Sequence, residues 1–210
     1  KMNITKRQYL SNPCGESSLP YWKTVNMNVP ENMLIKHNRN FGGECFVDYI
    51  DEPYFRLYHD LKMLRTSILP DGFQLCEASP AEYAAHINQC YADISITEEE
   101  IKSYFQHSVY SAALWIAVQE CKSKKIVATG VAELDEQIGE GILEWIQVSP
   151  THRGLGLGTY VVTELLTRIA QKAQFATVSG QINNPSKPEN LYRNCGFQGN
   201  DIWHVLKRRK

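Results

Sequence analysis

The chain has 210 residues and a mass of 24.0 kDa, which is enough for one well-packed core with a smaller extension. Its 22 Lys and Arg residues almost balance its 23 Asp and Glu residues, so no net field favours nucleic acid or an anionic membrane surface. The basic residues at 207–210 are interpreted as a solvated tail. We therefore expect neither a nucleic-acid partner nor a membrane partner.

The cysteine pattern bears on the redox compartment and on metals. The cysteines have neither a CxxC pair nor the spacing of metal ligands, which predicts free thiols, no metal site and a reducing compartment. The first residues, KMNITKRQYLSNPC, lack the apolar run of a secretory signal, and no segment approaches the ~18 apolar residues of a membrane span. We expect a cytoplasmic protein. The cysteines are Cys14, Cys45, Cys76, Cys90, Cys121 and Cys195.

Residues 1–72 are predicted to be an N-terminal extension that packs on the main domain. Pairs such as Glu52-Pro53 are typical of turns, so irregular structure is expected through most of this stretch. The aromatic residues between Tyr21 and Tyr58 are too many for a disordered arm. These rings either pack in a core or form one wall of a substrate pocket.

From residue 73 onward the signals are regular. The segment FQLCEAS predicts a strand, and Ser79 with Glu82 is a capping box that predicts the start of a helix. Thr97 with Glu100 repeats this signal for a second helix. Three apolar segments joined by short turns then predict an antiparallel meander: ALWIAVQE, KIVATGVAELD and ILEWIQVS.

The last third of the chain returns to the same sheet. Apolar residues repeat at helical spacing from Leu155 to Ala173 and predict a long helix with one buried face. The strand FATVSGQI follows this helix, so it should lie parallel to ILEWIQVS through a right-handed crossover. A short helix over 187–194 is expected to end at Gly196, and IWHVLK closes the sheet. The pattern predicts an α/β (α+β) protein with a mixed, mostly antiparallel sheet.

The stretch RGLGLG precedes the long helix and carries Gly154, Gly156 and Gly158. Glycines leave backbone N–H groups unshielded, and the helix turns its positive end toward them, so the stretch predicts an anion site. A P-loop is disfavoured because no lysine followed by a hydroxyl stands at the required offset. A dinucleotide fingerprint is disfavoured because its third glycine would fall on Thr159 and no acid follows near residues 177–180.

Two motifs together carry a resemblance. R-x-x-G-x-G stands here as Arg153, Gly156 and Gly158, and LYRNCGF at residues 191–197 carries the pattern L-Y-x-x-x-G-F. In this order, with a helix and a strand between them, they resemble the GNAT superfamily of acyl-CoA-dependent N-acetyltransferases. The resemblance implies a GNAT domain over residues 73–210, with helices on both faces of the sheet and a parallel strand pair that splays apart.

The resemblance implies acetyl-CoA as the cosubstrate. The loop N–H groups would hold its pyrophosphate, and the pantetheine arm would bind between the splayed strands like a short added strand. Arg153 would add a charge or brace the turn, and Asn184 would hold the arm or only shape a turn. The residues expected to bind acetyl-CoA are Ile146, Gln147, Val148, Arg153, Gly154, Leu155, Gly156, Leu157, Gly158, Thr159 and Asn184.

An amine with the pKa of lysine, ~10.4, must lose a proton before its nitrogen attacks a thioester. The resemblance makes Glu144 the candidate base, with Glu133 and Glu140 in reserve; the alternative is a solvated or cross-strand-paired carboxylate. By strand alternation Glu144, Ile146 and Val148 share one face, and Leu143, Trp145 and Gln147 share the other. A β-bulge would shift this assignment.

Tyr192 matches the general-acid position of the family and would protonate the departing thiolate; core packing is the alternative. A strand N–H near Ile146 or Gln147 would stabilise the oxyanion. An acyl-cysteine route through Cys195 is disfavoured, because the sequence places no histidine to activate it.

The predicted function is transfer of acetyl from acetyl-CoA to a primary amine by direct attack, through a tetrahedral intermediate. The alternative is a catalytically silent GNAT-like module that binds acyl-CoA for regulation. The presence of both Glu144 and Tyr192 favours the enzyme, because a pure sensor needs neither. The expected partner is a small-molecule or peptide amine, and the oligomeric state, monomer or homodimer, is left open.

Overall fold

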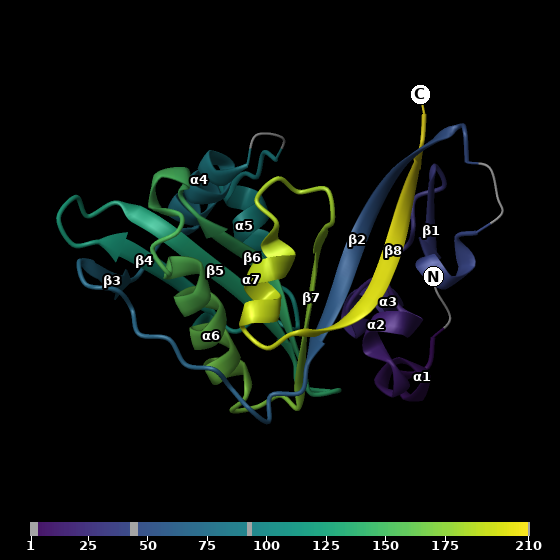
Figure 1. Ribbon diagram of the computed structural model, residues 1–210, viewed down its shortest axis with the longest axis horizontal. Helices are drawn as coiled ribbons and strands as arrows, with labels where there is room; N and C mark the ends of the chain where they lie inside the picture. The colour runs from purple at the N-terminus through teal and green to yellow at the C-terminus, as the bar shows by residue number, and fades with distance from the viewer. Residues whose placement is uncertain (1–3, 43–45, 92–93, 210) are drawn as a thin grey trace. The chain divides into compact units, whose positions relative to one another are not determined.

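The computed structural model describes residues 4–42, 46–91 and 94–209 (Figure 1). Cys45 and Lys210, on which sequence predictions fell, lie outside these residues. The chain divides into two compact units: Lys1–His59 with Thr177–Lys210 form the first, and Asp60–Ala176 form the second.

Three properties of the described residues concern membranes, metals and thiols. No helix in these ranges combines the length and the apolar character needed to cross a bilayer. The same ranges contain no group of three or more His, Cys, Asp or Glu side chains that could hold a metal ion. The free thiols are Cys14, Cys76, Cys90, Cys121 and Cys195.

The second unit follows the predicted order of elements. Both capping boxes are present at the starts of its first two helices, and its middle strands form the predicted antiparallel meander. The elements are β3 (Phe73–Cys76), α4 (Pro80–Cys90), α5 (Glu98–Tyr104), η2 (Ala112–Leu114), β4 (Trp115–Glu120), β5 (Ile126–Asp135), β6 (Glu140–Val148), η3 (Pro150–His152) and α6 (Leu157–Ile169).

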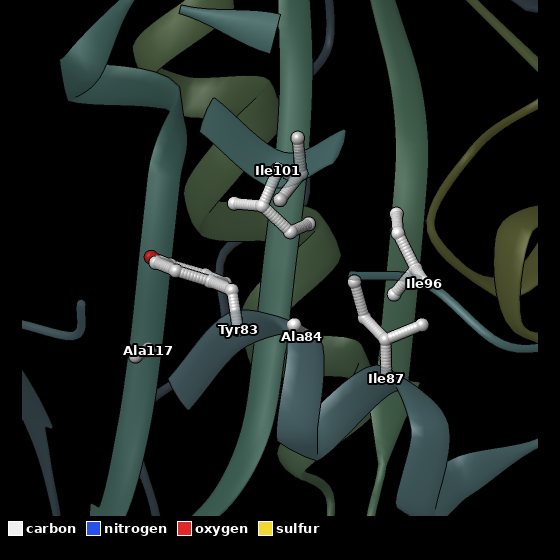
Figure 2. Packing of buried hydrophobic residues seen from close by; sticks show 7 residues of the cluster. Tyr83, Ala84, Ile87, Ile96, Ile101 and Ala117 are labelled. Carbon is white, nitrogen blue, oxygen red and sulfur yellow. The ribbon is translucent and has the colours of Figure 1, made fainter. Parts of the chain in front are cut away.

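Helices cover both faces of the meander. On one face, Tyr83 and Ile87 of α4 and Ile101 of α5 pack over β4 and β5 in a buried cluster (Figure 2). On the other face, a Cβ added to Gly130 of β5 would lie 2.5 Å from Cγ1 of Val161 in α6. Only glycine therefore lets α6 approach the sheet this closely.

The first unit contains more regular structure than its sequence suggests. Its elements are α1 (Lys6–Ser11), α2 (Pro13–Glu16), α3 (Tyr21–Asn26), β1 (Met33–His37), η1 (Asn38–Asn40), β2 (Tyr49–His59), α7 (Pro188–Asn194) and β8 (Gln198–Arg208). Strand β8 pairs antiparallel with both β1 and β2.

The prediction of irregular structure before residue 72 is wrong for most of this stretch. The pair Glu52-Pro53 lies inside β2 rather than in a turn, opposite Val205 and His204 of β8. Proline cannot donate to a neighbouring strand, but the carbonyl of Pro53 accepts a hydrogen bond from the amide of Ile182. Pairing with distant strands therefore overrides the local turn signal.

A buried arginine ties the N-terminal helices to this unit. Arg56 of β2 is 1% exposed, and its Nη2 donates to the hydroxyl of Tyr9 in α1 at 2.8 Å. Its Nη1 donates to Ser179 Oγ at 3.1 Å. Residues 4–59 thus share a compact unit with the C-terminal strand, and the predicted functional boundary at residue 72 stays a prediction.

The strands follow the order β1-β8-β2-β7-β6-β5-β4-β3, where β7 is Phe175–Gln181. The amides of Gln174 and Phe175 both donate to the carbonyl of Gly139, directly before β6, so β6 and β7 begin side by side and run parallel. The fold is a mixed, mostly antiparallel α/β sheet with one parallel pair, which confirms the predicted class.

Candidate functional site

The glycine loop forms the start of α6. Gly154 and Gly156 have φ angles of 80° and 83°, in the left-handed region that glycine adopts without strain. Gly156 is the N-cap of α6 and has no side-chain cap. The first helical hydrogen bond runs from the amide of Tyr160 to the carbonyl of Gly156, so the amides of residues 157–159 precede it. This exposed helix end is suited to binding an anion.

Arg153 contacts the strand rather than standing apart from it. Its Nε donates to the carbonyl of Val148 at 3.3 Å, and its side chain is otherwise exposed. The guanidinium therefore braces the loop against the end of β6, which was the alternative role given to it from the sequence. Because Arg153 is exposed, a second role as a positive charge is compatible with this brace.

The backbone groups of β6 alternate in direction. The amide of Ser149 donates to the carbonyl of Val127, which fixes the register and directs the backbone groups of Gln147 toward β5. Those of Ile146 and Val148 consequently point away from β5. The hydroxyl of Tyr91 lies 3.5 Å from the Ile146 carbonyl, on this outward side.

A β-bulge lies at Glu144. Val131 pairs with Trp145, and Ala132 pairs with Leu143, so Glu144 is the extra residue of β6. Trp145 packs against the cluster under α4 and α5. Leu143 shares a face with Gly141, where an added Cβ would meet Ile169 of α6 at 2.2 Å. The predicted grouping of Leu143 with Trp145 is wrong, because the bulge turns the strand by one residue between them. Glu144 itself is half-buried.

A buried histidine of α4 contacts residues at the end of β6, and the sequence analysis did not predict it. His86 of α4 is 3% exposed, and its Nδ1 and Nε2 lie 2.9 and 3.0 Å from the hydroxyl oxygens of Thr129 and Ser149. Burial lowers the pKa of His86 to about 4, so the ring is neutral at pH 7. The side-chain amide of Gln147 donates to the same Thr129 hydroxyl. No local signal links His86 to residues so far along the chain.

The reserve carboxylates lie inside the second unit. Glu133 and Glu140 are 3% and 0% exposed, and the Nδ1 of His107 lies 3.8 Å from a carboxylate oxygen of Glu133. Both carboxylates are less accessible to an incoming amine than Glu144.

Asn184 and Tyr192 belong to the first unit. Asn184 Oδ1 accepts hydrogen bonds from the amide and the hydroxyl of Ser186, at 2.9 and 2.8 Å. This is the turn role that the sequence left open as an alternative. Tyr192 lies on α7 and is 6% exposed, with its ring 6.1 Å from Phe55. Gly196 ends α7 as predicted, with a φ of 105°.

The motif at 191–197 also has a steric requirement. A Cβ on Gly196 would lie 2.7 Å from Nε2 of His59, so the ring of His59 occupies the space that any side chain would need. Cys195 beside it is fully buried, at 0% exposure. Glycine is therefore required here both for its backbone angle and for the approach of β2.

Residues 111–199 match the family model "Acetyltransferase (GNAT) domain". A search of curated proteins found no match.

Solved structures share the fold. A GCN5-related N-acetyltransferase from Sphaerobacter thermophilus has a TM-score of 0.64 and 18% identity over 76% of this chain and 52% of that one. A GNAT acetyltransferase from Novosphingobium aromaticivorans has a TM-score of 0.55 and 11% identity, over 88% and 71%. Ard1 from Thermoplasma volcanium has a TM-score of 0.52 and 12% identity, over 66% and 99%. The chain spans about half the length of the first of these proteins.

Proposed function

Because residues 111–199 belong to the GNAT acetyltransferase family, whose general chemistry is acyl transfer, we propose that this chain is an N-acetyltransferase that uses acetyl-CoA. It would transfer the acetyl group to a primary amine by direct attack through a tetrahedral intermediate. The observation that carries the proposal is the start of α6, which has no side-chain cap and which follows two glycines with left-handed backbone angles, Gly154 and Gly156.

The loop supplies the anion site. The amides of residues 157–159 precede the first helical hydrogen bond and lie at the positive end of a 13-residue helix. A pyrophosphate accepts hydrogen bonds from such amides, and the charge makes each bond stronger than a neutral one. We assign Arg153 and residues 154–159 to this role.

The pantetheine arm would bind along β6. Ile146 and Val148 direct their backbone groups away from β5, whereas those of Gln147 are used within the sheet. An amide-bearing arm can pair with outward groups as an added strand does. We therefore propose that the pantetheine arm pairs mainly with the backbone of Ile146 and Val148. The side chains of Tyr91 and Arg153, which contact the carbonyls of these two residues in the structure, would shift when the arm binds.

Glu144 is the proposed base. As the extra residue of a bulge it interrupts the regular pairing of β6, and it is more accessible than Glu133 or Glu140. The amine nitrogen would form a bond to the thioester carbonyl carbon while Glu144, directly or through a water, accepts the proton from nitrogen. An outward amide of β6 would stabilise the oxyanion.

Tyr192 is the proposed acid. When the tetrahedral intermediate breaks its C–S bond, the coenzyme departs as a thiolate, and the phenol of Tyr192 would give it a proton. Glu144 and Tyr192 belong to different units, so their joint action rests on the two family motifs. The free thiols of the described chain suit a reducing, cytoplasmic location, which we include in the proposal.

The experiment is transfer of labelled acetyl from acetyl-CoA to a panel of primary amines, with Glu144→Gln and Tyr192→Phe as variants. We expect turnover with at least one amine and a loss of kcat in both variants, with little change in the KM for acetyl-CoA. Binding of acetyl-CoA without turnover of any amine would instead favour the silent acyl-CoA-binding module.

A further inference from the structure

A half-open cavity of about 390 Å³ lies in the second unit, away from the glycine loop. It is bounded by the end of β3, the start of β4, η2 and α6. Arg168 lines it from the C-terminal part of α6, twelve residues after Gly156, which corresponds to about 18 Å along the helix axis. The cavity is therefore separate from the proposed cofactor site, and its size falls within the range of small-ligand pockets.

Aromatic rings form its walls. Trp115 of β4 packs edge-on against Tyr83, Phe105 and Tyr110, with ring centroids 5.1, 5.2 and 6.0 Å apart. The rings of Phe105 and Tyr110 also pack against each other, with their centroids 4.8 Å apart. Trp115, Phe105 and Tyr110 are only half-buried, so part of this aromatic surface faces the cavity. Such walls suit a flat apolar ligand.

The polar groups at the cavity are mainly hydrogen-bond donors. Burial raises the pKa of Tyr83, so its phenol stays protonated, and Cys76, Tyr110 and Arg168 all act on it electrostatically. Burial also raises the pKa of the Cys76 thiol. Tyr83, Tyr110, Cys76 and Arg168 all line this cavity, and the polar group of each can donate a hydrogen bond.

The guanidinium of Arg168 is held in place. Its Nε donates to a carboxylate oxygen of Glu164, and its Nη1 donates to the carbonyl of Ala113, both at 2.8 Å. Nη2 is thus the nitrogen through which Arg168 would meet a ligand. Of the nearby acids, Glu82 is engaged in the capping box of α4, and Glu77 is exposed at the rim.

We propose that this cavity is a second binding site, which takes a small hydrophobic carboxylate. The apolar body of the ligand lies against Trp115 and Phe105, and its carboxylate accepts hydrogen bonds from Arg168 and from the phenol of Tyr83. Aromatic walls alone would accept any flat apolar molecule; the donors select the anion among them. This inference does not depend on the proposed acetyl transfer.

The test compares probes that share an indole ring and differ in the charge of the group attached to it. Indole-3-acetate, 3-methylindole and tryptamine are titrated by calorimetry into the full chain, with and without acetyl-CoA. We expect indole-3-acetate to bind at least about tenfold more tightly than the other two, because only its carboxylate can accept charge-assisted hydrogen bonds from Arg168. Equal binding of all three probes, a preference for tryptamine, or no binding would overturn the proposal.

Two further measurements locate the site. Arg168→Met keeps the aliphatic stem and should weaken indole-3-acetate about tenfold, whereas Lys172→Met, which removes an exposed cation near the end of the same helix, should not. Indole-3-acetate should also slow alkylation of Cys76 and leave Cys121 unchanged. Binding that survives Arg168→Met, or that leaves the alkylation of Cys76 unchanged, would contradict this location. Circular dichroism confirms that each variant is folded.

Discussion

Two helices of the same unit begin in opposite ways. At the start of α4, Ser79 Oγ accepts from the amide of Glu82, and Glu82 Oε2 accepts from the amide of Ser79. At the start of α6, Gly156 stands in the left-handed region and provides no side-chain cap. The first amides of α4 are thus capped by side chains of the chain itself, whereas those of α6 have no side-chain cap. The difference agrees with the proposal that the start of α6 binds the cofactor.

The largest expected effect concerns Glu144, the proposed base on β6. Glu144→Gln should lower kcat by about 10²–10³-fold, because the amide keeps the shape of the side chain but cannot accept the proton of the amine. The KM for acetyl-CoA should change little. Steady-state kinetics with the best amine of the panel measures both quantities.

The matched control for this change is Glu136→Gln, which alters an exposed carboxylate paired with Lys172. It should leave kcat unchanged. A wild-type kcat in Glu144→Gln would remove this residue from the proposed mechanism.

The next effect concerns His86, which contacts Thr129 and Ser149 at the end of β6. The pKa of His86 is about 4 in the folded chain, against 6.5 for an ordinary histidine, so the unfolded chain binds a proton first as the pH falls. The contribution of the neutral ring to the free energy of unfolding is fully present above pH ~6.5. It is lost as the pH falls toward ~4, which lowers the free energy of unfolding by up to about 3 kcal/mol. Urea unfolding across this range measures it.

His86→Gln provides the comparison, because glutamine keeps polar contacts to Thr129 and Ser149 but does not titrate. Its stability should fall less steeply between the same pH values. Parallel curves for the two proteins would show that His86 is not the group that titrates.

The smallest effect concerns the capped start of α4. Ser79→Ala should cost about 1 kcal/mol of unfolding free energy and leave acetyl-CoA affinity unchanged. Ser103→Ala makes the same change inside α5, where alanine is the better helix former, and should be neutral or slightly stabilising. Thermal melts and calorimetry measure both properties. A loss of acetyl-CoA affinity in Ser79→Ala would break the distinction between the two helix ends.

The parts of the fold that sequence reasoning found are those with local causes. The capping boxes at Ser79 and Thr97 depend on residues three positions apart, and the helical spacing of α6 repeats within one segment. The glycine loop was visible for the same reason, since Gly154 and Gly156 adopt the angles that glycine permits.

The parts that it missed have distant causes. Pro53 lies in a strand because β8 pairs with it from the other end of the chain. The position of the bulge at Glu144 depends on how β5 meets β6, and the histidine support joins His86 to Ser149, 63 residues away. Such pairings depend on tertiary packing, which no local pattern encodes.

The most direct test of the proposed cofactor site at the start of α6 is calorimetric titration of acetyl-CoA into wild type, Gly156→Asp and Gly156→Asn. Asparagine and aspartate both tolerate the left-handed backbone and have nearly the same size, so the comparison isolates the replacement of a carboxylate by a neutral amide. We predict that wild type binds, and that Gly156→Asp binds at least about tenfold more weakly than Gly156→Asn, because its carboxylate repels the pyrophosphate. Equal affinities in the two variants, or no binding to wild type, would contradict the assignment of the start of α6 as the cofactor site.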